Sequence, residues 1–230
     1  MAQDDRRRRG KGLRADAREN RERILAAAKD VFAELGVDAP MVEVARRAGV
    51  GIATLFRRFP DKEALIAEAF AAKMTAYADA MEAALADPDP GRGFEGFILR
   101  VAEMQSEDRG FTRALTMGFT AATLFGAERQ RAFEGFQELI RRAKAAGVLR
   151  EDFVPQDLGL LLVANAGVIG ALGDAAPDAW RRVVAYLLQS FRPGGASPLP
   201  PPPEEGLLGE VMANLQRRNR AAGQRKGRGS

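Results

Sequence analysis

The chain lacks two residue types that carry much of enzyme chemistry, because it contains no histidine and no cysteine. Their absence excludes a disulfide framework, a thiolate nucleophile, a histidine general base and a Cys/His zinc site. No nucleophile–base pair or phosphate-binding loop is visible. Acid pairs such as Glu107–Asp108 and Glu151–Asp152 lie at the edges of expected helices, where solvated charge is usual. We therefore expect a protein that is not an enzyme and that uses no cofactor or metal ion.

Long hydrophobic runs are scarce as well. The longest, LGLLLVANAGVIGALG, has 16 residues (158–173), too few to span a bilayer, and is interpreted as a helix buried on most sides. The first residues, MAQDDRRRRGKGLRADA, are charged throughout and contain no apolar segment of the kind that a secretory signal needs. We expect a cytoplasmic protein with no membrane partner.

Alanine, leucine, arginine and glutamate are abundant, whereas β-branched residues occur in ones and twos rather than in alternating runs. This composition predicts an all-α protein. Apolar residues recur at helical spacing, and turn residues separate the segments that carry them. The expected helices cover residues 18–35, 40–49, 52–59, 62–85, 94–106, 111–124, 127–146, 155–173 and 177–192.

Charge and turn residues divide the chain into four parts. Residues 1–62 carry 15 Lys and Arg against 10 Asp and Glu, and residues 204–230 carry 6 against 3, while the middle is slightly acidic. Basic ends favour a polyanionic partner. The segment ADPDPGRG (86–93) predicts a domain boundary. We expect a disordered basic arm (1–17), a first helical domain with its connecting helix (18–85), a second helical domain (91–192), and a Pro-rich linker with a basic tail (193–230).

The stretch VARRAGVGIATLFRRFPDKEAL (44–65) has the pattern of a helix-turn-helix. Gly49 lies where the chain must turn sharply, often with a positive φ that glycine adopts at low cost. In this motif the second helix enters the major groove of DNA, with its N-terminal residues at the base edges. The apolar positions that let the two helices cross are Val44, Ala48, Val50, Leu55 and Phe59.

The residues that this arrangement leaves outward are the candidate DNA contacts. Small and apolar side chains at the start of the second helix allow close approach to thymine methyl groups, and Thr54 can donate or accept a hydrogen bond. Lys62 adds a cation in the first turn of the following helix, where backbone N–H groups already favour a phosphate. The candidates are Ile52, Ala53, Thr54, Phe56, Arg57, Arg58 and Lys62.

Three further motifs lie in residues 21–70: Ile-Leu-x-Ala-Ala with Phe-Ala-x-x-Gly in the first helix, Ala-x-x-Ala-Gly-Val at the turn, and Thr-Leu-Phe-x-x-Phe-Pro-x-Lys-Glu-x-Leu after it. With them this segment resembles the N-terminal DNA-binding domain of the TetR family of transcriptional regulators. The rest of the chain resembles the family only in outline, as an all-helical domain of suitable length. The resemblance implies a repressor that binds double-stranded DNA as a homodimer. It also implies a small-molecule effector whose binding shifts the two DNA-reading heads and releases a pseudo-palindromic operator.

The DNA contacts that the resemblance implies are Thr54, Phe56, Arg57, Arg58 and Lys62, with Leu55 and Phe59 in the core. Phe56 stands where the family usually has a tyrosine, so a hydroxyl bond to phosphate is lost. Arg58 replaces a common histidine, which should strengthen a contact to the DNA backbone and make it insensitive to pH. Met41 and Val42 replace more polar residues at the start of the preceding helix.

The second domain carries candidates for a ligand pocket and for a dimer interface. Seven of the 13 phenylalanines lie in residues 94–136 and can line a cavity for an apolar or amphipathic ligand, although such rings are more often ordinary core. Asn165 stands alone in an apolar helix, where it can bind a ligand, its symmetry mate or the backbone. The candidate ligand contacts are Phe97, Met104, Phe119, Phe133 and Asn165. The residues expected to pair in a four-helix dimer interface are Leu158, Leu161, Leu162 and Ile169 with Trp180, Val184, Leu187 and Leu188.

Other interpretations stay open. The main alternative is an architectural DNA-binding protein without a ligand switch, which would lack a cavity and bind DNA with little sequence preference. A membrane-surface role for residues 207–218 has thin support because the apolar face of that segment is short. The basic ends can act as phosphate-binding arms, with Arg6–Arg9 the stronger candidate. For residues 217–230 a solubilising tail is the simpler interpretation.

Overall fold

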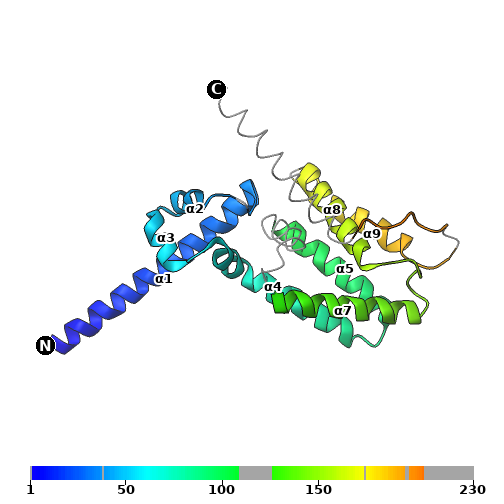
Figure 1. Cartoon of the computed structure of the whole chain (residues 1–230), viewed down its shortest axis with the longest axis horizontal. Helices are drawn as coiled ribbons and strands as arrows, with labels where there is room; N and C mark the ends of the chain where they lie inside the picture. Colours follow the sequence, from blue (N-terminus) through cyan, green and yellow to red (C-terminus); the bar gives the residue numbers. More distant parts are fainter. Residues whose placement is uncertain (1, 38, 109–125, 174, 195–196, 205–230) are drawn as a thin grey trace, which may run out of the picture. The chain divides into compact units, whose positions relative to one another are not determined.

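The computed structural model describes residues 2–37, 39–108, 126–173, 175–194 and 197–204. Within these ranges every regular element is a helix, which confirms the prediction of an all-α protein. The chain forms two compact units, Met1–Ala71 and Ala72–Ser230, and the fourth helix belongs partly to each. Figure 1 shows the helices of both units.

The first unit consists of α1 (Ala2–Leu35), α2 (Met41–Ala48), α3 (Ile52–Arg58) and the first residues of α4 (Lys62–Ala86). Its core is built on the apolar stripe predicted for the first helix, because Ile24 and Phe32 are fully buried. The Phe32 ring lies 6.3 Å from that of Phe70 on α4, centroid to centroid. Leu35, which belongs to the same sequence pattern, is instead 44% exposed at the end of α1.

α1 begins at Ala2, inside the segment where a disordered arm is expected, and continues without a break to Leu35. The segment contains no proline, and arginine, alanine and lysine all have high helix propensity. Asp4 and Asp5 precede Arg8 and Arg9 by four residues, a spacing that favours a helix.

The second unit consists of the rest of α4 with α5 (Pro90–Glu107), α7 (Gly126–Ala145), α8 (Pro155–Leu172) and α9 (Ala179–Ser190). Aromatic rings form the centre of its core. The Phe153 ring makes edge contacts with Phe94 and Phe191, at centroid distances of 5.4 Å and 4.9 Å. The helix expected at 111–124 and the tail beyond residue 204 lie outside the described residues.

The boundary between the units falls inside α4, after Ala71, and not at residues 86–93 as expected. The later residues of α4 are core residues of the second unit, with Met81 only 4% exposed. The segment 86–93 is therefore a tight corner between α4 and α5. A Cβ on Gly93 would lie 2.5 Å from the carbonyl oxygen of Ala84, so only glycine fits there. Asp89 closes the corner, because its Oδ1 accepts hydrogen bonds from the backbone N–H of Gly91 and Arg92.

Residues 197–204 of the Pro-rich linker have no regular secondary structure, and hydrogen bonds tie them to the second unit. Arg150 donates to the carbonyl oxygen of Ser197 (3.1 Å) and forms an ion pair with Asp152. Asp152 in turn accepts a hydrogen bond from the backbone N–H of Leu199 (3.1 Å). The hydrogen bond from Arg150, and then that from Leu199, lower the pKa of Asp152 to about 2.

Helix α8 is long and apolar enough, by length and composition alone, to cross a membrane. Its Leu158, Leu161 and Leu162 are nevertheless buried in the core of the second unit. A single helix of this kind is weak evidence for a membrane span.

Candidate nucleic-acid interface

The turn between α2 and α3 has the geometry that its sequence predicts. Gly49 ends α2 with φ 66° and ψ 34°, in the left-handed region, and its N–H donates to the carbonyl oxygen of Arg46. The N–H of Val50 donates to the carbonyl oxygen of Ala45 (3.0 Å), which closes the last turn of α2. Gly51 then begins α3 in an extended conformation. This corner sets the angle at which α3 leaves α2.

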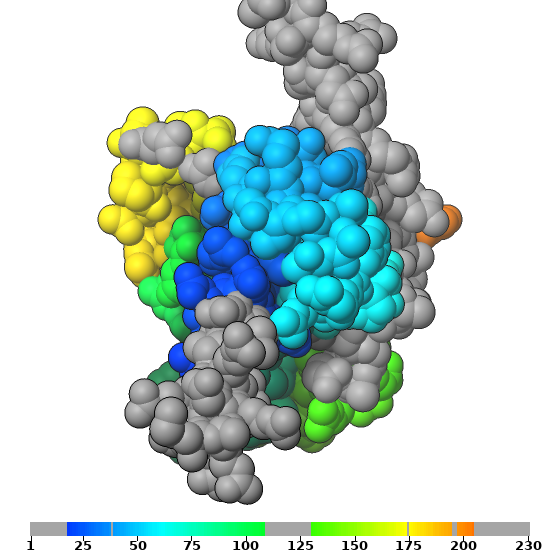
Figure 2. Space-filling model, turned by 90° about the vertical axis from the view of Figure 1, so that its left-hand side faces the viewer, coloured from blue at the N-terminus to red at the C-terminus, as the bar shows by residue number. Residues whose placement is uncertain are grey.

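Helix α3 buries one face and exposes the other. Leu55 and the following Phe59 are buried, with 0% and 1% of their surface exposed, as the motif predicts. Ile52 and Phe56 are 40% and 46% exposed, unusually high for such large apolar side chains. Ala53 and Arg57 are also exposed, while Thr54, Arg58 and Lys62 are half-buried. Figure 2 views the side on which α2 and α3 lie at the surface as light-blue and cyan atoms. The seven candidate DNA contacts therefore lie on or beside one short helix.

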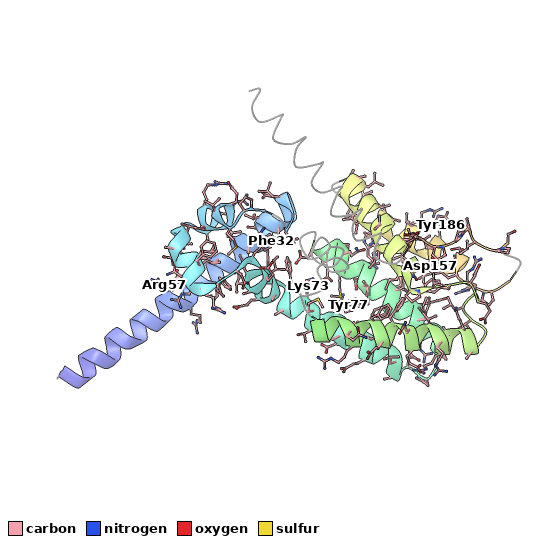
Figure 3. All side chains as sticks on the ribbon, in the orientation of Figure 1. Phe32, Arg57, Lys73, Tyr77, Asp157 and Tyr186 are labelled. Carbon is pink, nitrogen blue, oxygen red and sulfur yellow. The ribbon has the colours of Figure 1, made fainter. Side chains whose placement is uncertain are left out.

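The arginines of this unit differ in whether their charge is already neutralised. Arg47 forms a bidentate ion pair with Glu34 of α1 (2.6 and 2.9 Å), and Arg46 pairs with Glu43 within α2 (3.0 Å). The hydrogen bond from Arg47 lowers the pKa of Glu34 below its usual value. In contrast, no ion pair or hydrogen bond joins the side chain of Arg57 to any other described residue. Figure 3 shows Arg57 on α3 at the surface of this unit.

Arg58 is half-buried, and one nitrogen of its guanidinium makes no hydrogen bond to a described residue. Its Nε is buried and has no hydrogen-bond partner among the described residues. A buried donor without a partner costs about 1–3 kcal/mol. Arg57 and Arg58 thus supply unneutralised charge and an unused donor at the C-terminal end of α3.

A clamp that the sequence interpretation missed holds this end of α3. Arg21 of α1 makes a bidentate ion pair with Glu68 of α4, and its guanidinium lies 4.9 Å from the centre of the Phe59 ring. One side chain therefore links α1, the residue that ends α3, and α4. Both Arg21 and Glu68 lie within the segment that resembles the family, but their 47-residue separation gave no local signal.

Asp61 caps the start of α4. Asp61 Oδ1 accepts a hydrogen bond from the backbone N–H of Ala64 (2.7 Å), and α4 begins at the next residue, Lys62. At the other end of the motif Pro40 precedes α2 as its cap rather than being its first helical residue. Met41 is buried and Val42 is 56% exposed. The first turn of α2 therefore offers an apolar side chain to its surroundings.

This geometry is that of a helix-turn-helix, and comparisons with known proteins agree with it. A family model described as "Bacterial regulatory proteins, tetR family" matches residues 24–69. A second model, described as "Transcriptional regulator SbtR-like, C-terminal domain", matches residues 89–193. The chain belongs to the TetR family. As a TetR-family member it is a DNA-binding transcriptional regulator and not an enzyme.

The relatives that match this TetR-family chain cover different fractions of it. An HTH-type transcriptional regulator of Staphylococcus aureus (strain USA300) is 44% identical over 54 residues, which make up 23% of this chain and 29% of that relative. A crystal structure of a TetR transcriptional regulator from Streptomyces coelicolor is 31% identical, covering 76% of this chain and 99% of that one, with a TM-score of 0.46. The TetR-family regulator PfmR from Thermus thermophilus is 24% identical, covering 77% and 98%, with a TM-score of 0.55. The similarity to PfmR shows a shared fold only.

The candidate ligand contacts lie in different surroundings within the TetR C-terminal unit. Phe97 and Met104 of α5 are buried, and the Phe97 ring packs at 5.5 Å on Tyr77 and at 5.7 Å on Phe136. Phe133 is 41% exposed on α7, and Phe119 lies outside the described residues. The rings of Phe97 and Phe136 belong to the core cluster of this unit.

Asn165 is a polar residue that is fully buried on α8. Its Nδ2 donates to the carbonyl oxygen of Ala102 (3.2 Å) and to Oε1 of Gln105 (2.8 Å), while Gln105 donates to the carbonyl oxygen of Leu162 (3.3 Å). The Oδ1 atom of Asn165 is buried and has no partner among the described residues. Because Nδ2 donates to two acceptors, it is identified as the amide nitrogen. The atom without a partner is therefore the amide oxygen, which accepts hydrogen bonds.

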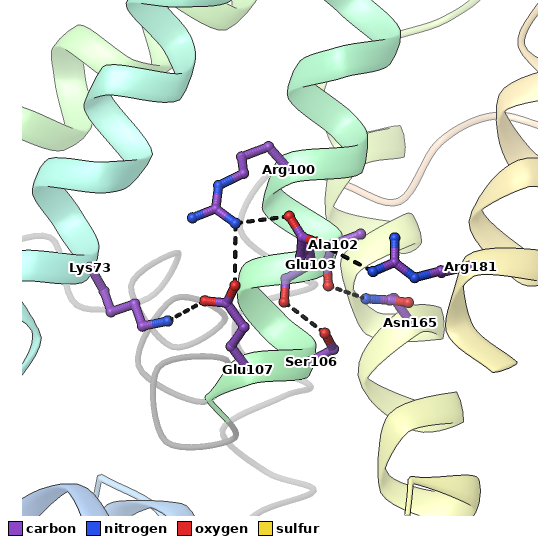
Figure 4. Close-up of polar contacts among 8 residues, drawn as sticks. All are labelled: Lys73, Arg100, Ala102, Glu103, Ser106, Glu107, Asn165 and Arg181. Atoms are coloured by element: carbon purple, nitrogen blue, oxygen red, sulfur yellow. Dashed lines mark hydrogen bonds and ion pairs between the residues drawn. The ribbon is translucent and has the colours of Figure 1, made fainter. Parts of the chain in front are cut away.

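A chain of ion pairs near Asn165 joins three helices (Figure 4). Lys73 of α4 forms an ion pair with Glu107 of α5 (2.6 Å), and Glu107 also forms an ion pair with Arg100 (3.3 Å). Glu103 of α5 binds Arg100 at 2.9 Å and Arg181 of α9 at 3.3 Å. The hydrogen bond from Lys73 is the main cause that lowers the pKa of Glu107. These bonds tie the second part of α4 to α5 and α9.

The residues expected to form the dimer interface are instead core residues of one protomer. Seven of them belong to the core cluster of the second unit: Leu158, Leu161, Leu162, Ile169, Trp180, Val184 and Leu188. An apolar stripe on a helix can be buried in the core of one protomer or in a dimer interface, and the sequence pattern does not distinguish these two roles. The outer face of α8 is small and apolar, with Leu160 at 42% exposure and Ala164, Gly167 and Ala171 exposed. On α9 the corresponding exposed ring is Tyr186 at 56%.

Among the described residues no group of three or more Asp, Glu, His or Cys side chains is placed to hold a metal ion.

Proposed function

We propose that this regulator is a cytoplasmic, ligand-responsive repressor that binds a pseudo-palindromic operator as a homodimer. The observation that carries the proposal is the outer face of α3. It combines exposed Ile52 and Phe56 with an arginine, Arg57, that has no partner in the described part of the chain. An exposed apolar pair beside an unneutralised cation suits thymine methyl groups and an adjacent phosphate or base edge.

Dimerisation is supported by the outer face of α8. A Cβ added to Gly167 or Gly170 would meet nothing within 4 Å, so this face has room for a second helix to approach closely. Leu160 adds an apolar contact at one end of the same face. Two DNA-reading heads about one helical turn apart would then read a pseudo-palindromic site.

The ligand is proposed to be a small apolar or amphipathic molecule bound near Asn165. The orphan Oδ1 is an acceptor, so the group that meets it should be a hydroxyl or amide donor rather than a carboxylate. Phe97 and Met104 of α5, which are both buried, would contact the apolar part. Release of DNA on ligand binding would require a different ligand affinity in the two states of the dimer.

Selection from a random duplex library, followed by titration of the enriched duplex, tests the DNA-binding role. Arg57→Ala should weaken binding by about 1–3 kcal/mol, at least fivefold, because it removes a base or phosphate contact. Arg23→Ala is the matched control, since it removes one exposed charge of α1 whose described partner is only Asn20. Equal affinities for Arg57→Ala and wild type would show that α3 is not the recognition helix. Failure to enrich any sequence would favour the architectural alternative.

Sedimentation at micromolar concentration tests the dimer. Gly167→Glu should shift the protein to a monomer, because a charge would be buried at the proposed interface. Gly96→Glu is the matched control, since a Cβ there also meets open space but lies on α5. A wild-type monomer, or a dimer unaffected by Gly167→Glu, would contradict the proposed interface.

Thermal-shift screening with medium-chain alcohols, amides and carboxylates tests the ligand class. Alcohols or amides that stabilise the wild type should lose their effect in Asn165→Leu, which removes the acceptor but preserves side-chain volume. Stabilisation by carboxylates alone would contradict the assignment of Oδ1. A ligand that leaves the affinity for the enriched duplex unchanged would contradict the repressor switch.

A further inference from the structure

The exposed side of α3 carries large apolar side chains where a recognition helix meets the bases of DNA. Ile52 and Phe56 are 40% and 46% exposed. Residues four positions apart are neighbours on a helix surface, so these two side chains form one apolar patch. Exposed apolar patches mark contact sites. The question is which group of the DNA this patch contacts.

Helical register separates the exposed side chains of α3 from the others. At about 100° per residue, positions 52, 53, 56 and 57 fall within a sector of about 140°, and all four residues are exposed. Thr54, Leu55 and Arg58 lie outside this sector and are half-buried or buried. The outer face of α3 therefore consists of Ile52, Ala53, Phe56 and Arg57.

The outer face of α3 offers little that can read bases through hydrogen bonds. Such readout uses Arg or Lys for guanine, Asn or Gln for adenine, and Asp or Glu for cytosine. Helix α3 contains no Asn, Gln, Asp or Glu, and both of its arginines lie in the last turn. In a helix-turn-helix the N-terminal residues of the second helix lie at the base edges. Thr54 has the one hydroxyl group of the helix, which can donate or accept and so discriminates weakly between bases.

An apolar side chain in the major groove can recognise the C5-methyl group of thymine. The same face of α3 also presents Arg57, whose charge no other described residue neutralises. A free cation beside an apolar patch suits a duplex, which carries phosphates next to its methyl groups. It does not suit an apolar protein surface, where an unpaired charge would be buried at a cost.

We propose that Ile52 and Phe56 read thymine through its C5-methyl group, and that this contact, rather than a hydrogen bond, sets the base preference of α3. This inference rests on the proposed function and adds the chemical group that is recognised. 5-Methylcytosine carries a methyl group at the same ring position. The affinity of the regulator for its site should therefore depend on C5-methylation of the DNA.

Uracil scanning of the enriched duplex tests the proposal. Replacing one thymine with uracil removes the C5-methyl group and leaves every hydrogen-bonding edge in place. The wild type should bind about fourfold more weakly for each contacted methyl group, because that apolar surface is no longer buried. The loss should be the same at every salt concentration, since an apolar contact releases no counterions. At the same position, a 5-methylcytosine pair should be bound about fourfold more tightly than a cytosine pair.

Alanine variants assign the contact to its side chains. Ile52→Ala and Phe56→Ala should bind the thymine duplex more weakly, and each should lose the uracil effect at the thymine that it contacts. Arg57→Ala should weaken binding but keep the full uracil effect. Val42→Ala is the matched control, since it shortens an apolar side chain that is 56% exposed on α2, and it should keep the full uracil effect as well. Circular dichroism checks that all four variants keep the wild-type helix content.

Equal binding of the wild type to thymine and uracil at every position would overturn the proposal without any variant. A full uracil effect in both Ile52→Ala and Phe56→Ala would also overturn it, as would equal affinity for cytosine and 5-methylcytosine where uracil weakens binding. If these two variants change the sedimentation of the free protein but not the uracil effect, the patch contacts protein and the proposal is likewise overturned. Failure of the proposed function gives a different result: no duplex is enriched, and both proposals then fall.

Discussion

Substitution of Arg21 tests how the recognition helix is held. Arg21→Met retains a long apolar stem but removes both the ion pair with Glu68 and the guanidinium above Phe59. The side chains of Arg21 and Glu68 are 41% and 34% exposed, so solvent screens the pair and it contributes about 0.5–1 kcal/mol. The cation–π contact adds about 0.5–1 kcal/mol. We expect Arg21→Met to lower the free energy of unfolding of the first unit by about 1–2 kcal/mol.

The two units can be followed separately because of where the chromophores lie. The single tryptophan, Trp180, and both tyrosines, Tyr77 and Tyr186, belong to the second unit. Intrinsic fluorescence therefore reports unfolding of the second unit, while circular dichroism in the far ultraviolet reports helices of both. Arg21→Met should shift the part of the dichroism transition in guanidinium chloride that comes from the first unit, and leave the fluorescence transition in place.

A double-mutant cycle with Glu68→Gln separates the ion pair from the ring contact. The coupling energy between Arg21 and Glu68 should be about 0.5–1 kcal/mol. The remainder of the Arg21→Met effect then belongs to Phe59. Arg23→Met is the control and should change stability by less than about 0.5 kcal/mol, as is usual for exposed positions. The clamp would be refuted if Arg21→Met and Arg23→Met had equal effects, or if the coupling energy were zero.

Three other substitutions or conditions have expected outcomes. Gly49→Ala should destabilise the first unit by about 1–2 kcal/mol in a dichroism titration, because φ 66° is unfavourable for an L side chain. Gly51→Ala avoids this strain and should cost less, because Gly51 has φ −68° and open space for a Cβ. Equal effects would refute the role of the turn. Asp152→Asn should lower the free energy of unfolding of the second unit by the same amount at all pH values from about 5 to 8. This difference from the wild type should shrink only below the carboxyl's ordinary pKa of 3.8 and vanish near 2, because a group whose pKa is lowered in the folded state stabilises it above the unfolded pKa. A difference that changes between about pH 5 and 8 would contradict the Arg150 pair. DNA affinity at fixed salt should be constant from about pH 6 to 8 in a fluorescence-anisotropy titration, because no histidine is present to titrate there; a tenfold change would require another titrating group.

The sequence by itself was sufficient for the helix-turn-helix. Its helices are short and their signals are local: a glycine at the turn, a proline and an aspartate before α4, and apolar residues at helical spacing. Local patterns of this kind depend on neighbours within a few residues, which is why the burial of Leu55 and Phe59 could be predicted. The exposure of Phe56 followed from the same periodicity.

Tertiary structure decided everything that depends on distant partners. Arg21 and Glu68 are 47 residues apart, and Asn165 and Gln105 are 60 apart, so no window of sequence could show that one pair clamps α3 and the other leaves an unpartnered acceptor. The apolar stripes of α8 and α9 fit an intramolecular core and a dimer interface equally well, because periodicity tells which residues avoid water and not what covers them. The unit boundary lies inside a continuous helix for the same reason: only packing shows where one core ends and the next begins.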